Sequence, residues 1–307
     1  MKFFIKLLIG VFLAGAGYGV YRVNNTIKIF NKYSLNKKPL TKTSRQELHE
    51  KIENKQSVNF LLLGVDDGAL KRHEKGRSDT IMILSLNPKT KKSELVSIPR
   101  DMGAIMPGQA NVGEAKVNTA YLLGGPHAMA KSIKQHFDVP IDGYAVINMG
   151  GLEALLKAVG GVRVKSNLTF TQDWYHFKKG HYYKLHGKKA LAYIRERHED
   201  PRGDYGRQVR QRQVLKAIVK KLTHSTVLLD QSKAKKIAKH VHTDLTKQDF
   251  IKLGLNYRDC LSNMHDTHAQ GYSKDVYNMN YGLMEIEEMT PKENKRITKI
   301  IEKNMQQ

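Results

Sequence analysis

The sequence predicts an α/β protein: a layered α-β-α sandwich around a mixed central sheet, preceded by one N-terminal transmembrane helix. Three observations lead to this class. Residues 3–20 are almost entirely apolar, residues 58–65 form an apolar run of strand length, and strand and helix patterns are mixed from there to residue 222. Strands mixed with helices indicate layers packed around one sheet. With 307 residues, the chain is long enough to bury a sizeable core.

The N-terminal apolar stretch, residues 3–20, is interrupted only by Lys6. A helix of this length reaches about 27 Å, close to the roughly 30 Å hydrocarbon core of a bilayer, and Lys6 lies near enough to its end to reach the headgroups. A retained signal anchor competes with a cleaved signal peptide whose small-residue site would be Ala14-Gly15-Ala16. We expect the anchor, over residues 1–22. The flanking charges leave its orientation open.

A polar, basic stem over residues 23–56 follows, with a short helix near 46–53. Because the run 58–65 is apolar apart from Asn59, it indicates a strand covered on both faces. Gly160-Gly161 is typical of a helix C-cap. The other expected elements are strands over 80–86 and 94–98 with a hairpin loop over 87–92, a helix over 128–137, a strand over 144–147, a helix over 151–159, a strand over 162–164, and helices over 188–195 and 207–222.

The second of the last two helices, 207–222, carries apolar residues on one face, at Val209, Val214, Leu215, Ile218 and Leu222. Beyond it the composition becomes polar and lysine-rich, and the helical patterns weaken. We therefore assign residues 57–225 to the main domain and residues 226–307 to a C-terminal basic extension, packed on that domain or following it.

The chain is strongly basic, with 52 Lys and Arg against 29 Asp and Glu, a net charge of +23. This surplus favours polyanionic partners: anionic lipid, nucleic acid or phosphate-rich polymers. The sequence shows no helix-turn-helix signature and no basic stripe interleaved with aromatic residues, so nucleic acid is not expected. Cys260 is the only cysteine, which excludes an intrachain disulfide.

Carboxylates follow one predicted strand and begin the next. Asp66 ends the run 58–65, with Asp67 behind it, and Asp79 precedes the strand over 80–86. If these strands are neighbours, both carboxylates lie at the edge where open α/β sheets usually bind ligands. Mg²⁺ takes one or two carboxylates and completes its shell with water and substrate phosphates. The alternative is that these residues are turn or N-cap residues, and the sequence leaves both interpretations open.

Guanidinium groups cluster later in the chain. Arg195 and Arg197 lie two residues apart, so in an extended segment both point the same way. Arginine binds phosphate oxygens bidentately. Arg207 and Gln211 share a helix face at i and i+4. A solvated basic face is the alternative. Trp174, in a Tyr- and His-rich loop, either stacks on a sugar or packs as a loop aromatic.

Taken in order, these segments resemble the LytR-CpsA-Psr family of cell-wall glycopolymer transferases, and the resemblance covers roughly residues 55–225. Seven segments carry it: Leu61-Leu62-Leu63-Gly64-Val65-Asp66, Arg77-Ser78-Asp79-Thr80, Ser97-Ile98-Pro99-Arg100-Asp101, Lys116-Val117-Asn118-Thr119-Ala120-Tyr121, Leu155 to Val162, Ala190 to Arg197, and Gly203-Asp204-Tyr205-Gly206-Arg207 with Gln211.

The resemblance implies a reaction and a place. Family members are single-pass proteins of the cell membrane with an extracellular catalytic domain. They transfer an anionic glycopolymer, of the wall teichoic acid or capsule type, from a polyprenyl pyrophosphate to a peptidoglycan hydroxyl. The expected acceptor is the C6 hydroxyl of N-acetylmuramic acid, and polyprenyl phosphate is released. The implied partners are the lipid-linked polymer, the peptidoglycan strand and anionic membrane lipid, without nucleic acid.

The resemblance also implies residue roles. Asp66 and Asp79 would hold Mg²⁺, or Mn²⁺ in its place. Asp204 would orient Arg207 or act on the incoming hydroxyl, so that the catalytic set is Asp66, Asp79, Arg100 and Asp204. The pyrophosphate contacts would be Arg100, Lys116, Arg195, Arg197, Arg207 and Gln211. Many members carry a basic or aromatic residue where this chain has Gly103-Ala104, which puts one phosphate contact in doubt.

Two other functions use the same residues or the same charge. A membrane-tethered regulator, or transcriptional attenuator, would bind a polyanion without catalysis. A polyprenyl-pyrophosphate hydrolase would use the same site with water as the attacking group. A pure binder has no need of Asp66, Asp79, Arg100, Arg195 and Arg197 together, whereas the sequence cannot separate transfer from hydrolysis.

Overall fold

The structure is a computed structural model and describes residues 42–65, 76–223 and 241–306. The predicted anchor, most of the predicted stem, and Asp66 and Asp67 lie outside these residues. The chain divides into two compact units. Unit 1 contains Met149–Ser262, and unit 2 contains Lys38–Asn148 with Asn263–Gln307. Within the described ranges, no helix combines the length and apolar character that crossing a membrane requires.

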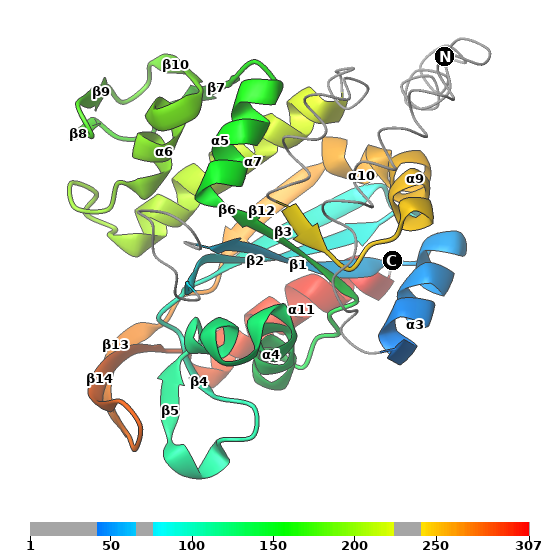
Figure 1. Cartoon of the computed structure of the whole chain (residues 1–307), viewed down its shortest axis with the longest axis vertical. Coiled ribbons are helices and arrows are strands. Elements are labelled where there is room, and N and C mark those ends of the chain that lie inside the picture. The colour runs from blue at the N-terminus through cyan, green and yellow to red at the C-terminus, as the bar shows by residue number, and fades with distance from the viewer. Residues whose placement is uncertain (1–41, 66–75, 224–240, 307) are drawn as a thin grey trace. The chain divides into compact units, whose positions relative to one another are not determined.

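Unit 2 is built on a mixed sheet, which confirms the predicted class. Its strands lie in the order β6-β1-β2-β3-β12, with bounds Gly143–Asn148, Val58–Val65, Ser78–Asn87, Lys92–Ile98 and Met264–His268 (Figure 1). Strand β2 runs antiparallel to β1 and to β3. Strand β6 is parallel to β1, and β12 is parallel to β3. The predicted hairpin between β2 and β3 is confirmed by the pairing of Asn87 with Lys92.

Strand β1 shows why an apolar run, here interrupted only by Asn59, predicts a strand with two covered faces. Leu61, Leu63 and Val65 are buried on one face, and Val58 and Phe60 are buried on the other. The polar residue within the strand, Asn59, donates hydrogen bonds to its neighbours. Its backbone N–H donates to Asp142 Oδ2 at 2.7 Å, and its side-chain amide donates to the carbonyl of Pro140 at 2.9 Å.

Helices α4 (Thr119–Phe137) and α11 (Pro291–Gln306) pack together over β2, and α11 also covers β3 (Figure 1). Their buried residues include Met129 and Ile133 on α4 and Ile297 and Ile301 on α11. Helix α4 includes the predicted segment 128–137 but begins at Thr119. It is broken at Gly124 and Gly125, just before Pro126, because proline cannot continue the helical hydrogen bonds. A second helical layer over this sheet stays a prediction.

The smaller elements of unit 2 lie at opposite ends of the sheet (Figure 1). Helix α3 (Lys42–Glu53) confirms the short helix expected near 46–53 and contacts β1 and β6. Strands β4 (Gly103–Ile105) and β5 (Glu114–Lys116) form one hairpin, and β13 (Tyr272–Asn278) and β14 (Gly282–Glu288) form another. Residues 263–306 therefore supply β12, a hairpin and α11, where sequence reasoning found only weak helical patterns.

Unit 1 has its own core, and the helices and the strand predicted for this stretch are confirmed. They are α5 (Met149–Ala158), β7 (Val162–Lys165), α6 (Gly187–Arg195) and α7 (Asp204–Thr223). Gly160 and Gly161 cap α5 as expected, with φ of +73° and +77° and a bond from Gly161 N to Leu156 O at 2.7 Å. The elements that the sequence did not indicate are β8 (Phe170–Gln172), β9 (Tyr175–Phe177), β10 (Tyr182–Leu185), β11 (Val241–Thr243), α9 (Lys247–Asn256) and α10 (Arg258–Ser262).

Helix α7 corrects the face predicted for it. Of the predicted apolar residues, Val214 and Ile218 are buried, but Val209 and Leu215 are only half-buried. The side chain of Leu222 lies outside the described residues. The first turns instead bury polar side chains, namely Arg207, Gln208, Arg210 and Arg212. A charged side chain is buried only when it has partners, and those partners define much of the candidate site.

Candidate functional site

A chain of alternating charges lies at one end of the sheet in unit 2. Arg100 Nη1 donates to Asp79 Oδ1 at 2.6 Å, and Arg100 Nε lies 3.5 Å from Asp101 Oδ2. Lys116 Nζ lies 3.2 Å from the other oxygen of Asp101. All four side chains are partly exposed. The structure therefore brings together three predicted site residues, Asp79, Arg100 and Lys116. It adds Asp101, which belongs to one of the sequence motifs but had no predicted role.

Strand register explains this cluster. Because β2 and β3 are antiparallel with Ile81 opposite Ile98, the start of β2 lies beside the end of β3, which brings Asp79 next to Arg100. The next segment then turns back. Val117 N donates to Met102 O at 2.7 Å, and Gly103 pairs with Lys116 across β4 and β5. Lys116 is thereby held beside Asp101.

Asp79 occupies a β-bulge. Gly64 pairs with Thr80 and Val65 pairs with Ser78, so Asp79 is the extra residue between two pairs. Bulges re-aim side chains and are common beside functional sites. Asp79 is therefore a strand residue rather than a turn or N-cap residue. Gly64 is needed here, because a Cβ at that position would lie 2.9 Å from Thr80 Cβ.

The carboxylates fit a divalent cation chemically. Strands β1 and β2 are neighbours, as the prediction required, and Val65, the residue before Asp66, pairs with Ser78, the residue before Asp79. The side chain of Asp79 is 28% exposed, so a ligand can reach it. No group of three or more His, Cys, Asp or Glu side chains that could hold a metal occurs within residues 42–65, 76–223 and 241–306. Mg²⁺ does not require such a group, since water and phosphate complete its shell.

Packing explains why this chain has Gly103-Ala104 at the position where a basic or aromatic residue was expected. A Cβ on Gly103 would collide with Ile286 Cδ1 of strand β14, and Ala104 is buried. Strand β14 is held in this position because Glu287 N donates to Asp101 O at 2.8 Å. A longer side chain at position 103 therefore has no room while the hairpin of β13 and β14 packs here.

In unit 1, Arg195 ends α6 and Arg197 follows it in an extended segment. Both arginine side chains are exposed, while Glu196 between them is buried. This alternation is the one predicted for two side chains pointing the same way. The backbone of Glu196, with φ of −56° and ψ of 133°, is extended as the prediction required.

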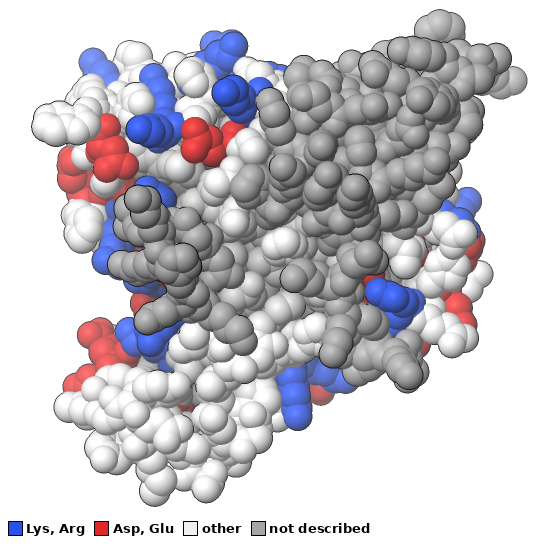
Figure 2. Space-filling view, viewed as in Figure 1, with Lys and Arg blue, Asp and Glu red and all other residues white. Residues whose placement is uncertain are grey.

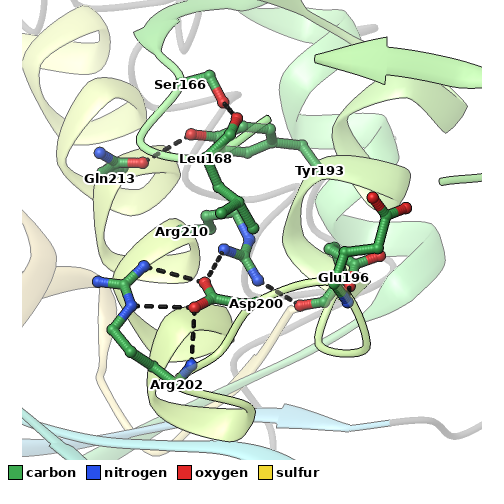
Figure 3. Close-up of polar contacts among 9 residues, drawn as sticks. Ser166, Leu168, Tyr193, Glu196, Asp200, Arg202, Arg210 and Gln213 are labelled. Carbon is green, nitrogen blue, oxygen red and sulfur yellow. Dashed lines mark hydrogen bonds and ion pairs between the residues drawn. The ribbon is translucent and has the colours of Figure 1, made fainter. Parts of the chain in front are cut away.

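A buried ion pair holds the loop that follows these arginines (Figure 3). Arg210 Nη1 donates to Asp200 Oδ2 at 2.6 Å, and neither side chain has any exposed surface. Arg210 Nη2 donates to the carbonyl oxygen of Glu196 at 2.5 Å. Arg202 adds bonds from Nε and Nη2 to the same carboxylate, at 3.0 and 2.9 Å. Arg210 thus ties helix α7 to the peptide between Arg195 and Arg197.

The charge of Asp200 is strongly favoured. Burial raises the pKa of its carboxyl, but hydrogen bonds from Arg202 and Arg210 outweigh burial and hold the pKa at about 2. Gly206 allows this arrangement, since a Cβ there would collide with the Asp200 carboxylate. Sequence reasoning missed Asp200 and Arg210, because burial decides their role.

The first turn of α7 carries the remaining predicted residues. Arg207 is largely buried, and its Nη2 lies 2.5 Å from Asp204 Oδ1. Gln208 Nε2 donates to the other oxygen of Asp204 at 3.0 Å. These contacts favour the orienting role for Asp204 over direct action on the acceptor hydroxyl. Gln211, one turn further along α7 from Arg207, is half-buried.

Comparison with known proteins agrees with this chemistry. The model of the LytR_cpsA_psr family matches residues 20–299. A protein of Bacillus anthracis named polyisoprenyl-teichoic acid–peptidoglycan teichoic acid transferase TagU is 38% identical over 275 residues, which cover 88% of this chain and 87% of that protein.

Solved structures show the same fold. The crystal structure of TagU from B. subtilis matches with a TM-score of 0.64 at 30% identity, covering 82% of this chain and 98% of that chain. An Enterococcus faecalis structure described as a transcriptional regulator matches with a TM-score of 0.70 at 31% identity, covering 83% and 90%. The extent of these matches and of the family model shows that the chain belongs to the LytR-CpsA-Psr family.

Proposed function

We infer that this chain transfers an anionic glycopolymer from a polyprenyl pyrophosphate to a peptidoglycan hydroxyl. The hydroxyl oxygen of the acceptor attacks the phosphorus that carries the polymer. The bond from that phosphorus to the bridging oxygen breaks, polyprenyl phosphate leaves and the hydroxyl proton is released. The observation that carries this inference is the match over 88% of the chain to a relative named for this transfer.

The side chains can supply what phosphoryl transfer needs, which is positioning and neutralisation of charge. Arg100 in unit 2 and Arg195 and Arg197 in unit 1 serve the pyrophosphate, with Lys116, Arg207 and Gln211 as further contacts. The ion pairs with Asp79 and Asp101 fix the orientation of the Arg100 guanidinium. The bond from Arg210 to Glu196 fixes the peptide between the other two arginines. Asp204 orients Arg207.

In this proposal Asp79 and Asp66 would hold Mg²⁺, which would supply positive charge to offset the charge of the phosphate oxygens. The partly exposed carboxylate of Asp79 in its bulge supports this assignment. Mn²⁺ would suit the same oxygen ligands.

The proposed place of action is the outer face of the cell membrane. Residues 1–22 form a single-pass anchor, and the rest of the chain lies outside, where peptidoglycan is found. The apolar stretch 3–20 and the peptidoglycan substrate in the relative's name support this placement.

The test uses the full chain in detergent, with Mg²⁺, a lipid-pyrophosphate-linked oligosaccharide and uncrosslinked glycan strands. A covalent product between oligosaccharide and glycan, lost on chelation with EDTA, is expected. Release of phosphorylated oligosaccharide without a glycan product would show that the chain hydrolyses the donor rather than transferring its polymer. Binding of the donor without either product would favour the non-catalytic regulator that the Enterococcus faecalis description suggests.

A further inference from the structure

We propose that unit 1 carries a second binding surface, which takes the polyanionic repeats of the donor polymer at a place separate from the pyrophosphate. The surface, called here the β7–β10 face, consists of Arg163, Lys165, Tyr182 and Lys184, with Trp174 on the neighbouring hairpin of β8 and β9. This inference rests on the proposed function for the identity of the polymer. Its evidence is independent of the catalytic residues.

All outward positions of the two-stranded sheet are basic or aromatic. Lys165 lies opposite Tyr182, and Arg163 lies opposite Lys184. These four side chains are exposed, whereas Val162, Val164 and Leu185 point inward and are buried. Like charges directly opposite each other destabilise a sheet, so the stability of the hairpin does not explain the Arg163–Lys184 pair.

Tyr182 lies among cations. The guanidinium carbon of Arg163 is 4.4 Å from the centroid of its ring, and Lys165 Nζ is 5.9 Å from the same point. Although the sequence shows no basic stripe interleaved with aromatic residues, the fold assembles one from two strands that are 16 residues apart in the chain. Such a surface offers both phosphate contacts and a ring on which a sugar can stack.

Trp174 is held out at the tip of the hairpin of β8 and β9. Its side chain is fully exposed, which corrects the alternative of a packed loop aromatic. Its φ is +68°, and that of Asp173 is +47°. Two-residue hairpin turns of this kind favour Asn-Gly or Asp-Gly, and a bulky residue at positive φ is an outlier. Both the exposure and the backbone conformation are unfavourable, which points to a ligand that contacts the indole.

The charge of the surrounding segment matches a polyanion. Residues 161–189 contain a single acid, Asp173, against seven basic residues: Arg163, Lys165, Lys178, Lys179, Lys184, Lys188 and Lys189. Figure 2 shows Lys and Arg side chains over the region where Figure 1 places β7, β9 and β10, with Asp and Glu side chains beside them. Two acids on other segments lie beside this one: Glu199 accepts a bond from Thr171 N of β8 at 3.0 Å, and Glu153 lies next to Gly187.

A phosphate-bearing glycopolymer fits this surface better than a bilayer does. Side chains two apart on one face of a strand repeat every ~7 Å, which is of the order of the spacing between phosphates in an extended phosphodiester chain. A membrane-inserting tip needs several adjacent apolar side chains. Trp174 is instead preceded on the turn by Gln172 and Asp173 and followed by the half-buried Tyr175, with Thr171 and His176 exposed nearby. The alternation of cations and rings matches alternating phosphates and sugars.

The test measures binding of a labelled poly(glycerol phosphate) oligomer, without prenyl pyrophosphate, to the full chain at about 0.1 M salt. Trp174 is the only tryptophan of the chain, so its fluorescence reports directly on the hairpin tip. We expect polymer to change this fluorescence. The variant with Arg163→Gln, Lys165→Gln and Lys184→Gln should bind about tenfold more weakly, and Trp174→Ala should bind several-fold more weakly.

A matched control separates this face from net charge. Lys292→Gln, Lys295→Gln and Lys299→Gln remove the same charge from exposed positions of α11 and should change affinity less than about twofold. Equal loss in both triple variants would overturn the proposal, as would absence of binding by the unmodified chain. Stronger binding of phosphatidylglycerol vesicles or single-stranded DNA to the same face would overturn the proposal of the polymer as its ligand, in favour of that partner. Because this binding assay requires no turnover, its result can be interpreted even if the transfer assay shows no activity.

Discussion

Arg210 is a charged residue with no exposed surface, and its partners show why the fold accepts it. Removing a charge from water costs several kcal/mol unless the group is paired and fully hydrogen-bonded. Arg210 is paired with Asp200 and bonded to the backbone oxygen of Glu196, while its buried Nε makes no hydrogen bond within the described residues. A purely structural pair could bond anywhere on the loop. This one bonds the peptide between Arg195 and Arg197, so Arg210 is a positioning residue for both.

Arg210→Lys tests this role. Lysine keeps the charge but loses the fork that reaches Asp200 and Glu196 together. We expect the free energy of unfolding to fall by about 3 kcal/mol, and the KM for the lipid pyrophosphate to rise more than kcat falls. The control is Arg202→Lys, which changes an exposed partner of the same carboxylate and should cost less than about 1 kcal/mol. Equal effects of the two variants on KM would contradict the positioning role.

The low pKa of Asp200 makes a separate prediction. Because its folded value, about 2, is below the ordinary 3.8, the ionised carboxylate stabilises the fold above pH 3.8, and this stability is lost as pH falls toward 2. Asp200→Asn should therefore destabilise the protein most at pH 5 and above, by at least about 2 kcal/mol. Urea unfolding from pH 6 to pH 3 measures the difference in the free energy of unfolding between the unmodified chain and the variant. This difference should become smaller as the pH falls. A difference that grows as the pH falls would refute the low pKa of Asp200 in the folded protein.

Asp79→Asn tests the proposed metal ligand. The substitution keeps the size of the side chain and its bond to Arg100 but removes the charge that a divalent cation needs. Because Asp79 is partly exposed, stability should change by less than about 1 kcal/mol, whereas transfer should fall by about a hundredfold or more. Radiometric transfer across a Mg²⁺ titration is the measurement. Full activity with an unchanged Mg²⁺ response would remove Asp79 from the site.

At the scale of elements, the length and regularity of the apolar pattern decided which helices and strands the sequence could predict. Strand β1 and helix α5 were predictable because each carries an apolar run or repeat of sufficient length. Strands β8, β9 and β10 have only three or four residues each, too few for a period to show. The break in α4 follows Gly124-Gly125-Pro126, a sequence signal that was available but unused. The exposed hairpin of β13 and β14 has neither a long apolar run nor a clear helical repeat.

Helices α4 and α11 meet through a histidine whose protonation the fold disfavours. His136 Nε2 lies 3.1 Å from Asn294 Oδ1. Burial lowers the pKa of His136, and this outweighs the opposing effects of Asn294 and of the charge on Glu288. A histidine with a lowered folded pKa contributes full stability above 6.5, and that contribution is lost as pH falls below 6.5 toward the folded value.

His136→Gln therefore should remove part of the pH dependence of stability. Unfolding monitored by circular dichroism between pH 7.5 and pH 5 should show the unmodified chain losing more stability with acid than the variant does. The exposed His265→Gln on β12 serves as the control for general histidine titration. A steeper pH dependence in His136→Gln than in the unmodified chain would contradict the stated direction of the pKa shift.

At the scale of the molecule, the predicted site residues divide between the two units: Asp79, Arg100 and Lys116 belong to unit 2, and Arg195 and Arg197 belong to unit 1. The order of the motifs predicts Asp79, Arg100, Lys116, Arg195 and Arg197 as site residues. Their supporting partners, Asp101, Asp200 and Arg210, were not predicted, because a buried or bonded charge looks like a solvated charge in a sequence. Unit 2 is also discontinuous. The parallel pairing of β12 with β3 joins residues about 170 apart, and no local pattern can indicate such a contact.

That discontinuity makes the C-terminal segment indispensable to unit 2. A chain ending at Ser262 would lack β12 and α11, and would expose the sheet residues that Ile297 and Ile301 cover. We expect it to be insoluble or to lack a cooperative unfolding transition. Ile301→Ala should cost about 2–5 kcal/mol, whereas Leu255→Ala, at an exposed site, should stay within about 0.5 kcal/mol. A soluble chain ending at Ser262, with unchanged thermal unfolding, would show that unit 2 folds without its last strand and helix.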